Sequence, residues 1–207
     1  ECRYLKEPRP GKLRALVAGT SRASGSFLVF SDADTLYPPH YLQMCESLLG
    51  KAGAGLVALM ALPVSGDPDR AASRLGRLAY VGLSRVFSRH TYTGGYGQIL
   101  RRDAFEKCGG YSDSIWPYVL ADHEIMVRLL RLGTARYHSD LWCLPSDRRK
   151  DRRRVRWNVG ERFLYHALPH RRHDWFFHRF LRRRFERKGL FLLNLREKSW
   201  GAPPRDP

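Results

Sequence analysis

Residues 11–35 of this 207-residue chain read GKLRALVAGTSRASGSFLVFSDADT, and this stretch decides the fold class. Its first part places Leu13, Leu16 and Val17 on one helical face, and Gly25 is a natural helix stop. The run Phe-Leu-Val-Phe that follows is apolar throughout, as strands are when a parallel sheet buries both of their faces. A helix followed by a buried strand is therefore predicted here.

The same alternation of helical and strand-like patterns continues along the chain. The further elements predicted are a helix over residues 38–50, a strand over 56–62, a helix over 67–86, a strand over 97–100 and a helix ending at Gly133. Alternating strands and helices predict an α/β fold with a mostly parallel sheet flanked by helices. In such sheets, ligands bind beyond the carboxyl ends of the strands.

Composition excludes several classes of protein. A hydrophobic share of 43% with 12% aromatic residues excludes a disordered chain. No apolar run approaches the roughly 20 residues of a complete transmembrane helix. The four cysteines are scattered, which is typical of reduced thiols in a cytoplasmic protein rather than of a zinc site or disulfide framework. Because the chain begins at Glu1, without Met or a signal-peptide pattern, we expect it to be a piece of a longer protein.

Charge divides the chain. Residues 148–188 hold 16 Lys and Arg against four Asp and Glu, which is +12 of the net +17. We therefore predict a first domain over residues 1–147 and a basic α-helical C-terminal extension over 148–207. Apolar residues at four-residue spacing from Val155 to Ala167 predict an amphipathic helix that ends at Pro169.

The basic extension has three interpretations. Residues 175–185 mix aromatic and arginine residues, a composition that suits an anionic membrane surface, so this interpretation ranks first. A solvated arginine-rich face whose rings pack on the domain ranks second. Nucleic-acid binding ranks third, because basic patches with aromatics also suit phosphates and bases but no named nucleic-acid motif is present.

Two carboxylates, Asp32 and Asp34, stand directly after the predicted buried strand. Their hard oxygens suit Mg²⁺ or Mn²⁺, and such an ion commonly accompanies phosphates. The functional interpretation is a metal that neutralises the charge of a diphosphate leaving group. The alternative is an ordinary turn, since Asp is frequent in turns, and for so short a pattern alone that alternative is favoured.

Four segments, in this order, change that weighting. They are residues 11–25, GGYGQ at 94–98 leading into RRDAFEKCGGY at 101–111, DHEIMVRLLRLG at 122–133, and RRVRW at 153–157. Together they resemble the corresponding motifs of family 2 glycosyltransferases, which have the GT-A fold. The resemblance covers about residues 11–157.

The resemblance implies an inverting, metal-dependent transfer of a sugar from a nucleotide-diphosphate donor to a hydroxyl of a saccharide or lipid-linked acceptor. It implies that Asp32 and Asp34 hold Mg²⁺ or Mn²⁺ and that Asp122 is the general base. The residues it assigns to donor binding are Lys12, Asp32, Asp34, Arg156 and Trp157. The expected location is the cytoplasm, with peripheral association at the cytoplasmic face of a membrane.

The chain departs from the family pattern at two positions, which keeps other functions open. Val17 replaces an Asn, Ala121 replaces a Glu, and the family's first two strands would precede Glu1. One alternative is a non-catalytic GT-A-like module recruited to membranes, and another is a basic nucleic-acid-binding protein. For Asp122 itself the alternative is a helix N-cap. Its neighbour Glu124 is interpreted as a secondary site residue because the family usually has an acid there.

Overall fold

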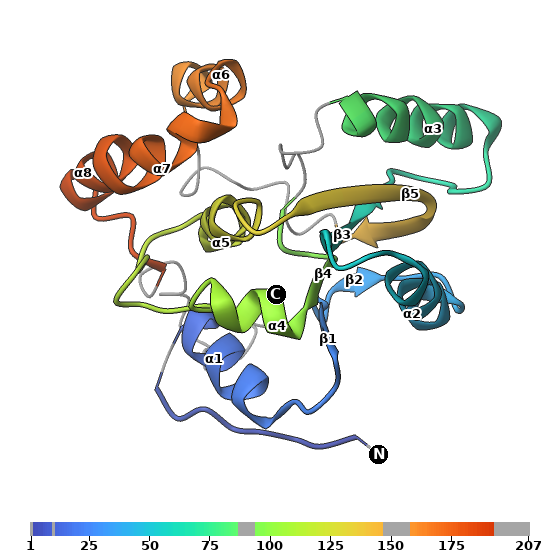
Figure 1. The fold of residues 1–207 in the computed structure, drawn as a ribbon, viewed down its shortest axis with the longest axis horizontal. Coiled ribbons are helices and arrows are strands. Elements are labelled where there is room, and N and C mark those ends of the chain that lie inside the picture. Colours follow the sequence, from blue (N-terminus) through green and yellow to red (C-terminus); the bar gives the residue numbers. More distant parts are fainter. Residues whose placement is uncertain (1, 10, 87–93, 147–157, 193–207) are drawn as a thin grey trace, which may run out of the picture.

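The computed structural model describes residues 2–9, 11–86, 94–146 and 158–192. These residues form one five-stranded sheet in the order β1-β4-β3-β5-β2, with helices on both sides (Figure 1). Its strands are β1 (Phe27–Phe30), β2 (Thr35–Leu36), β3 (Leu56–Pro63), β4 (Gln98–Arg101) and β5 (Thr134–Pro145). The mixed α/β fold class predicted from the sequence is therefore confirmed.

The sheet is mixed, so the prediction of a mostly parallel sheet is wrong. β3 and β5 are parallel, whereas β1–β4, β3–β4 and β2–β5 are antiparallel. β4 lies between β1 and β3 and runs against both of them. The first three residues of β4, Gln98 to Leu100, are buried, and this pattern marks burial without revealing strand direction.

Most predicted helices are present. The helices before the extension are α1 (Lys12–Arg22), α2 (Tyr41–Lys51), α3 (Ala71–Val86), α4 (Arg102–Lys107) and α5 (Ala121–Leu129). The short elements β2 and α4 were not predicted. Helix α3 begins four residues later than expected, because the Asp67 carboxylate accepts the Asp69 N–H at 2.8 Å in a separate turn.

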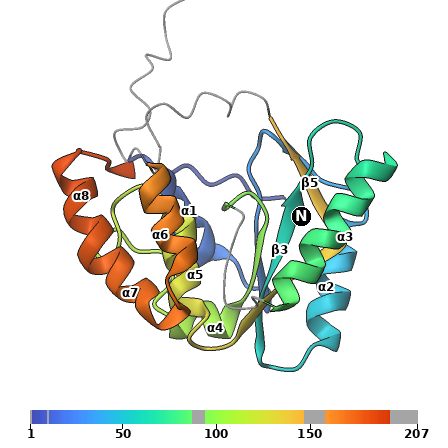
Figure 2. The same cartoon turned by 90° about the horizontal axis from the view of Figure 1, so that it is seen from above.

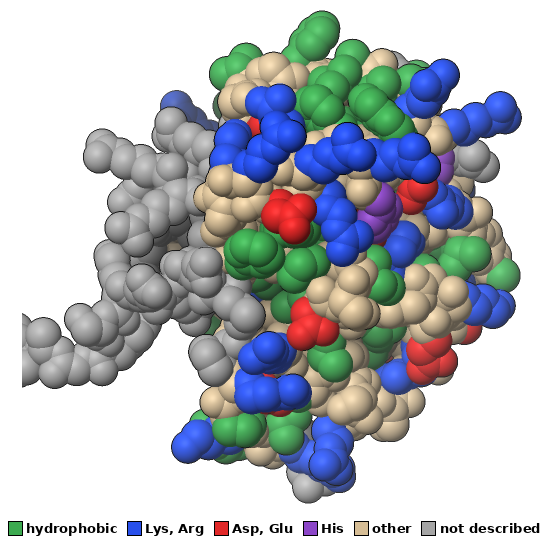
Figure 3. Space-filling model, turned by 90° about the vertical axis from the view of Figure 1, so that its left-hand side faces the viewer, with side chains coloured by type: hydrophobic (Ala, Val, Ile, Leu, Met, Phe, Trp, Pro, Cys, Tyr) green, Lys and Arg blue, Asp and Glu red, His purple; other side chains and the backbone are tan. Residues whose placement is uncertain are grey.

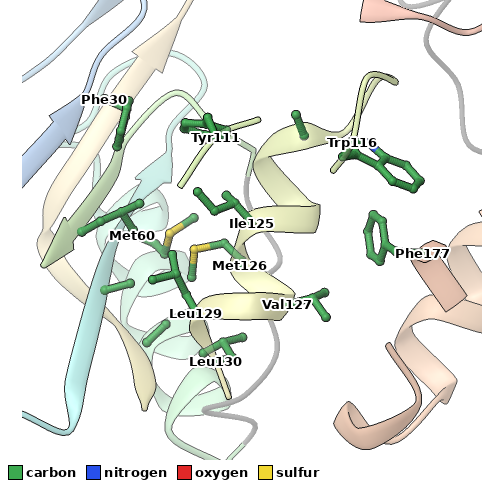
Figure 4. Packing of buried hydrophobic residues seen from close by; sticks show 14 of the residues in the cluster. Phe30, Met60, Tyr111, Trp116, Ile125, Met126, Val127, Leu129, Leu130 and Phe177 are labelled. Carbon is green, nitrogen blue, oxygen red and sulfur yellow. The ribbon is translucent and has the colours of Figure 1, made fainter. Parts of the chain in front are cut away.

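Two apolar clusters fill the two sides of the sheet. One contains Tyr41, Cys45 and Leu49 of α2 and packs against β3 and β5. The larger cluster joins the opposite side of the sheet to α5, and Figure 4 shows Met60 of β3 facing the buried side chains of that helix. Helix α5 buries Ile125 and Leu129 completely, which fixes the position of its first turn relative to the sheet.

The C-terminal residues pack on this larger cluster. They form α6 (Val159–Ala167), η2 (His170–Arg172), α7 (His173–Trp175), the π-helix η3 (Phe176–Leu181) and α8 (Arg182–Arg187), drawn in orange to red in Figure 2. Phe177 and Phe185 are buried beside Trp116, with ring centroids 5.4 and 6.0 Å from it. Several aromatics expected at a membrane surface therefore belong to the core. The predicted domain boundary at residue 147 lies outside the described residues.

Over the described residues, no helix combines the length and the apolar character needed to cross a bilayer.

Candidate active site

The carboxyl end of β1 and the start of β4 meet at one edge of the sheet. Phe30, the last residue of β1, is in register with Gln98, the first residue of β4. Asp32 follows Phe30 by two residues, and the backbone carbonyl of Asp122 accepts a hydrogen bond of 2.8 Å from Gln98 Nε2. Gln98 therefore connects the loop after β1 with the first turn of α5, although 90 residues separate Asp32 from Asp122 in the sequence.

The Asp122 side chain faces the glycine loop before β4. Its Oδ2 accepts the Gly95 N–H at 2.5 Å, and its Oδ1 accepts the His123 N–H at 3.1 Å. A Cβ on Gly95 would lie 2.9 Å from the Asp122 Cβ, so only glycine allows this close approach. The N-cap position belongs to Leu120, so the structure does not support the alternative that Asp122 is the cap residue.

Leu120 adopts a left-handed conformation, with φ 66° and ψ 27°. Such a conformation costs a non-glycine residue of the order of 1 kcal/mol or more and persists only where the surroundings enforce it. Here it turns the chain sharply into α5, so that Asp122 enters the first helical turn facing the glycine loop.

A series of buried hydrogen bonds holds the backbone of Asp122 in place. The Tyr111 hydroxyl donates to Gln98 Oε1 at 2.7 Å, and Gln98 in turn donates to the Asp122 carbonyl. Burial, followed by the nearby charge of Asp122, raises the pKa of Tyr111, so its hydroxyl stays a neutral donor. The Asp32 charge contributes to the same shift, which places both carboxylates within electrostatic reach of this one hydroxyl.

A second connection runs through Tyr37. Its hydroxyl accepts the Asp32 N–H at 3.2 Å and donates to the Tyr96 carbonyl at 3.0 Å. It thereby ties the loop after β1 to the glycine loop that contacts Asp122. Neither Tyr37 nor Gln98 was predicted as a site residue. Gln98 ends the GGYGQ segment and is a polar residue at the head of an apolar run, and these were its signals in the sequence.

Lys12 and Asp34 complete this edge. Lys12 Nζ, in the first turn of α1, lies 2.9 Å from Asp32 Oδ1. The Asp34 carbonyl accepts the Ser146 N–H at 3.0 Å, which brings the end of β5 beside the same loop. Asp32 and Asp34 therefore share the loop after β1, Lys12 of α1 contacts Asp32, and Gln98 and Tyr37 link this loop to the surroundings of Asp122. The other predicted residues, Arg156 and Trp157, lie outside the described residues.

The comparison with protein families settles the family. Residues 1–109, more than half of the chain, match the sequence model of glycosyl transferase family 2. The chain belongs to glycosyl transferase family 2. The structure of this family 2 chain has the GT-A fold, as the motif resemblance predicted. A separate comparison with curated proteins returned no match.

The comparison with solved structures found matches at low sequence identity. One is the mannosyltransferase PcManGT from Pyrobaculum calidifontis in complex with GDP-Man and Mn²⁺, with a TM-score of 0.54, 21% identity and coverage of 76% of this chain and 43% of that one. Another is S. aureus TarS 1-349 in complex with UDP-GlcNAc, with a TM-score of 0.44, 16% identity and coverage of 86% and 53%. The family 2 chain thus spans about half the length of the structures it matches.

A set of metal ligands supplied wholly by the protein is not present in the described parts of the chain. No three His, Cys, Asp or Glu side chains among the described residues gather in a metal-binding group. Asp32 and Asp34 offer two hard carboxylates on one turn, and the Asp32 side chain is only partly exposed, at 16%. Such a donor set fits Mg²⁺ or Mn²⁺, which take most of their ligands from water and substrate phosphates.

A pocket of about 500 Å³ adjoins the site on the α2 side. Ser31 and Tyr37 line it from the loop after β1, and Tyr41 and Gln43 line it from α2. The described residues that line it include none of the three carboxylates. The pocket therefore lies beside the edge of the sheet that carries Asp32, Asp34 and Asp122, which we call the acidic edge, and not at its centre.

Glu124 is a structural residue, so its interpretation as a secondary site residue is wrong. Both of its oxygens accept hydrogen bonds of 2.8 Å from Arg128, and His178 Nε2 of the C-terminal helices lies 3.2 Å from Oε1. Its side chain is 1% exposed. Burial by itself would raise the pKa of Glu124, but the hydrogen bonds from His178 and Arg128 lower it below the ordinary value. The carboxylate thus joins α5 to η3.

Replacing this carboxylate is expected to destabilise the fold. Glu124→Ala leaves Arg128, whose side chain is 11% exposed, without its carboxylate partner, which costs about 3–5 kcal/mol of unfolding free energy. Because the folded pKa is lowered, the Glu124 contribution is present above its unfolded pKa and is lost as the pH falls through the folded one. Urea unfolding of the wild type and variant, at neutral and acidic pH, measures both effects.

The matched control is Glu106→Ala. Glu106 also pairs with an arginine four residues away, Arg102, but at 3.6 Å and with a side chain that is 63% exposed. Its loss is expected to cost less than about 1 kcal/mol. Equal destabilisation by the two substitutions would contradict the role assigned to Glu124.

Proposed function

We propose that this chain carries the catalytic edge of an inverting glycosyltransferase that moves a sugar from a nucleotide-diphosphate donor to an acceptor hydroxyl. Family 2 membership and the GT-A fold support a glycosyltransferase. The observation that carries the finer proposal is the convergence of Asp32 and Asp122, joined through Gln98 and through the Tyr37–Tyr96 contact.

Asp122 is proposed as the general base. A carboxylate offers about four acceptor positions, and the Gly95 and His123 amides occupy two of those on Asp122. The remaining lone pairs are available to an acceptor hydroxyl, from which Asp122 takes the proton as the oxygen attacks the donor sugar. Displacement in a single step inverts the configuration of the sugar carbon. The amides also fix the orientation of the base before substrate arrives.

Asp32 and Asp34 are proposed to hold Mg²⁺ or Mn²⁺. The ion, when bound, neutralises the negative charge that develops on the leaving diphosphate. Lys12, 2.9 Å from Asp32, adds a positive charge on the same side of the site. Arg156 and Trp157 remain proposed donor-binding residues. The Mn²⁺ and GDP-Man in the PcManGT complex support a donor and metal of these classes.

A turnover assay tests this function. The full-length protein is incubated with Mn²⁺ and a panel of hexose donors that includes GDP-Man and UDP-GlcNAc, with saccharide or lipid-linked acceptors, and released nucleotide diphosphate is measured. Acceptor-dependent release from at least one donor is expected. Absence of both turnover and nucleotide binding would favour a non-catalytic module. Tight DNA or RNA binding at physiological salt would favour a nucleic-acid-binding protein.

A further inference from the structure

Helix α3 covers β5 with a face of mixed character. It buries Arg77, Val81 and Ser84, and Val81 packs together with the half-buried Tyr80 on the larger apolar cluster. Arg77 Nη1 donates to the Pro68 carbonyl and Ser84 Oγ to the Val81 carbonyl, both at 2.8 Å. A helix that covers a sheet normally turns most of its apolar residues inward. On α3 a second set of apolar residues faces solvent.

The outward side of α3 is a continuous apolar stripe. Leu75 and Val86 are 70% and 76% exposed, and Leu78 and Leu83 lie between them at helical spacing. Four large exposed aliphatic side chains on one helical face are more than the scattered apolar residues expected on a soluble surface. The stripe therefore requires a partner.

Helix α6 presents a second apolar surface on the same side of the molecule. Val159 and Phe163 are 87% and 73% exposed, whereas Tyr165 is buried. Figure 1 draws both α3 and α6 along the top of the molecule, on opposite sides of it, as the view from above in Figure 2 also shows. Figure 3 shows apolar side chains gathered along that top. We call these six side chains the apolar face: Leu75, Leu78, Leu83, Val86, Val159 and Phe163.

The charge around the apolar face is positive. Residues 71–86 contain no Asp or Glu, and the single acid of α6, Glu161, is buried and paired with Arg184 at 2.8 Å. Exposed arginines flank the stripes, namely Arg85 on α3 and Arg162 on α6. Arg74 of α3 is also exposed, but it pairs with Asp69 at 3.1 Å. Figure 3 shows a band of Lys and Arg side chains below the apolar top.

From this arrangement we propose that the apolar face docks on the surface of an anionic phospholipid bilayer. Apolar side chains enter the boundary between headgroups and acyl chains, while the flanking arginines contact lipid phosphates. A second copy of the chain is the poorer partner, because its own arginines would be brought against these. We thus assign membrane binding to α3 and α6, and not to the aromatic residues of 175–185 that the sequence favoured.

The proposal also relates the membrane to the acidic edge. β1 and β3 both run antiparallel to β4, so the carboxyl end of β3 lies at the edge where Asp32 follows β1. The chain leaves β3 at that edge and enters α3. Docking of α3 would therefore hold the acidic edge near the bilayer, where a lipid-linked acceptor is presented; this last step rests on the proposed function, whereas the docking itself does not.

Vesicle flotation tests the docking. The chain is mixed with phosphatidylcholine vesicles, with or without phosphatidylglycerol, and we expect it to float only with the anionic ones. Leu75→Gln with Leu78→Gln is expected to weaken this binding by about tenfold or more, since each leucine loses apolar burial. The matched control is Leu36→Gln with Leu42→Gln, two leucines equally exposed on β2 and α2, which should leave binding unchanged.

A charge variant and a measurement of mass complete the test. Arg85→Gln with Arg162→Gln is expected to lower the preference for anionic vesicles several-fold, and added salt should do the same. Circular dichroism verifies folding of each variant. Failure of the wild-type chain to float, or undiminished flotation of the Leu75/Leu78 variant, would overturn the proposal. Light scattering that shows self-association abolished by the same leucine substitutions would instead assign the face to a second copy.

Discussion

Asp122→Asn is expected to lower kcat for sugar transfer about 10²–10⁴-fold, the usual contribution of a general base. Asparagine has the same size, and its carbonyl oxygen can still accept the Gly95 N–H that holds Asp122. It cannot take up the proton of the acceptor hydroxyl. The KM for the donor should therefore change little, because the substitution removes chemistry and not donor contacts.

Asp103→Asn is the matched control for this variant. Asp103 also lies in the first turn of a helix, α4, and its carboxylate accepts a backbone N–H, that of Ala104 at 2.8 Å. No role in sugar transfer is proposed for Asp103, so the kcat of the Asp103→Asn variant should equal that of the wild type. Steady-state kinetics on the full-length protein, with thermal unfolding to verify the fold, separates the two outcomes. Turnover by Asp122→Asn close to the wild-type value would remove Asp122 from the mechanism.

Most helices and strands could be predicted from the spacing of apolar residues, because burial in the core imposes that spacing. The helix α2 and the strand β3 lie where the spacing predicted them, since the apolar residues of both are buried where the helix packs on the sheet. The direction of the strands could not be predicted in this way. The burial pattern of β4 is the same whether its neighbours run with it or against it. The direction is shown only by the register, which runs from Phe27 opposite Arg101 to Phe30 opposite Gln98.

The orientation of amphipathic helices was equally beyond the sequence. Spacing identifies an apolar stripe on α6 but does not say whether the protein or the solvent receives it. In this case Tyr165 and Glu161, between the stripe residues, turn inward, because Glu161 forms the capping box with Asn158 and pairs with Arg184. Tertiary partners, absent from any local pattern, decided which side was buried.

Within the site, the motifs identified the charged residues and missed those that join them. Asp32 and Asp122 stand at places where the family resemblance points to chemistry. Gln98 and Tyr37 act through contacts with residues 24 and 59 positions away, and such contacts leave no local signature. Glu124 shows the opposite error, since its acidic character suggested chemistry while Arg128 and His178 hold it in a structural role.

The second large effect is expected at the carboxylates after β1. Asp32→Asn and Asp34→Asn should each weaken Mn²⁺-dependent binding of a nucleotide diphosphate about 100-fold or more, because a hard divalent cation loses one of its two anionic protein ligands. Calorimetry with GDP and UDP measures this on the full-length protein. Chelation of the metal from the wild type should abolish the same binding, and addition of Mn²⁺ should restore it.

Lys12→Met distinguishes the metal from the ion pair. Asp32→Asn removes a proposed metal ligand and also breaks the contact with Lys12, whereas Lys12→Met breaks the contact and leaves both carboxylates in place. The pair is about half-exposed on its lysine side, so its loss should cost less than about 1 kcal/mol of stability in either variant. Binding of Mn²⁺ alone, followed by electron paramagnetic resonance, should survive Lys12→Met and be lost in Asp32→Asn. If Mn²⁺ binds equally to both variants, the ion is held elsewhere and Asp32 serves only to position Lys12.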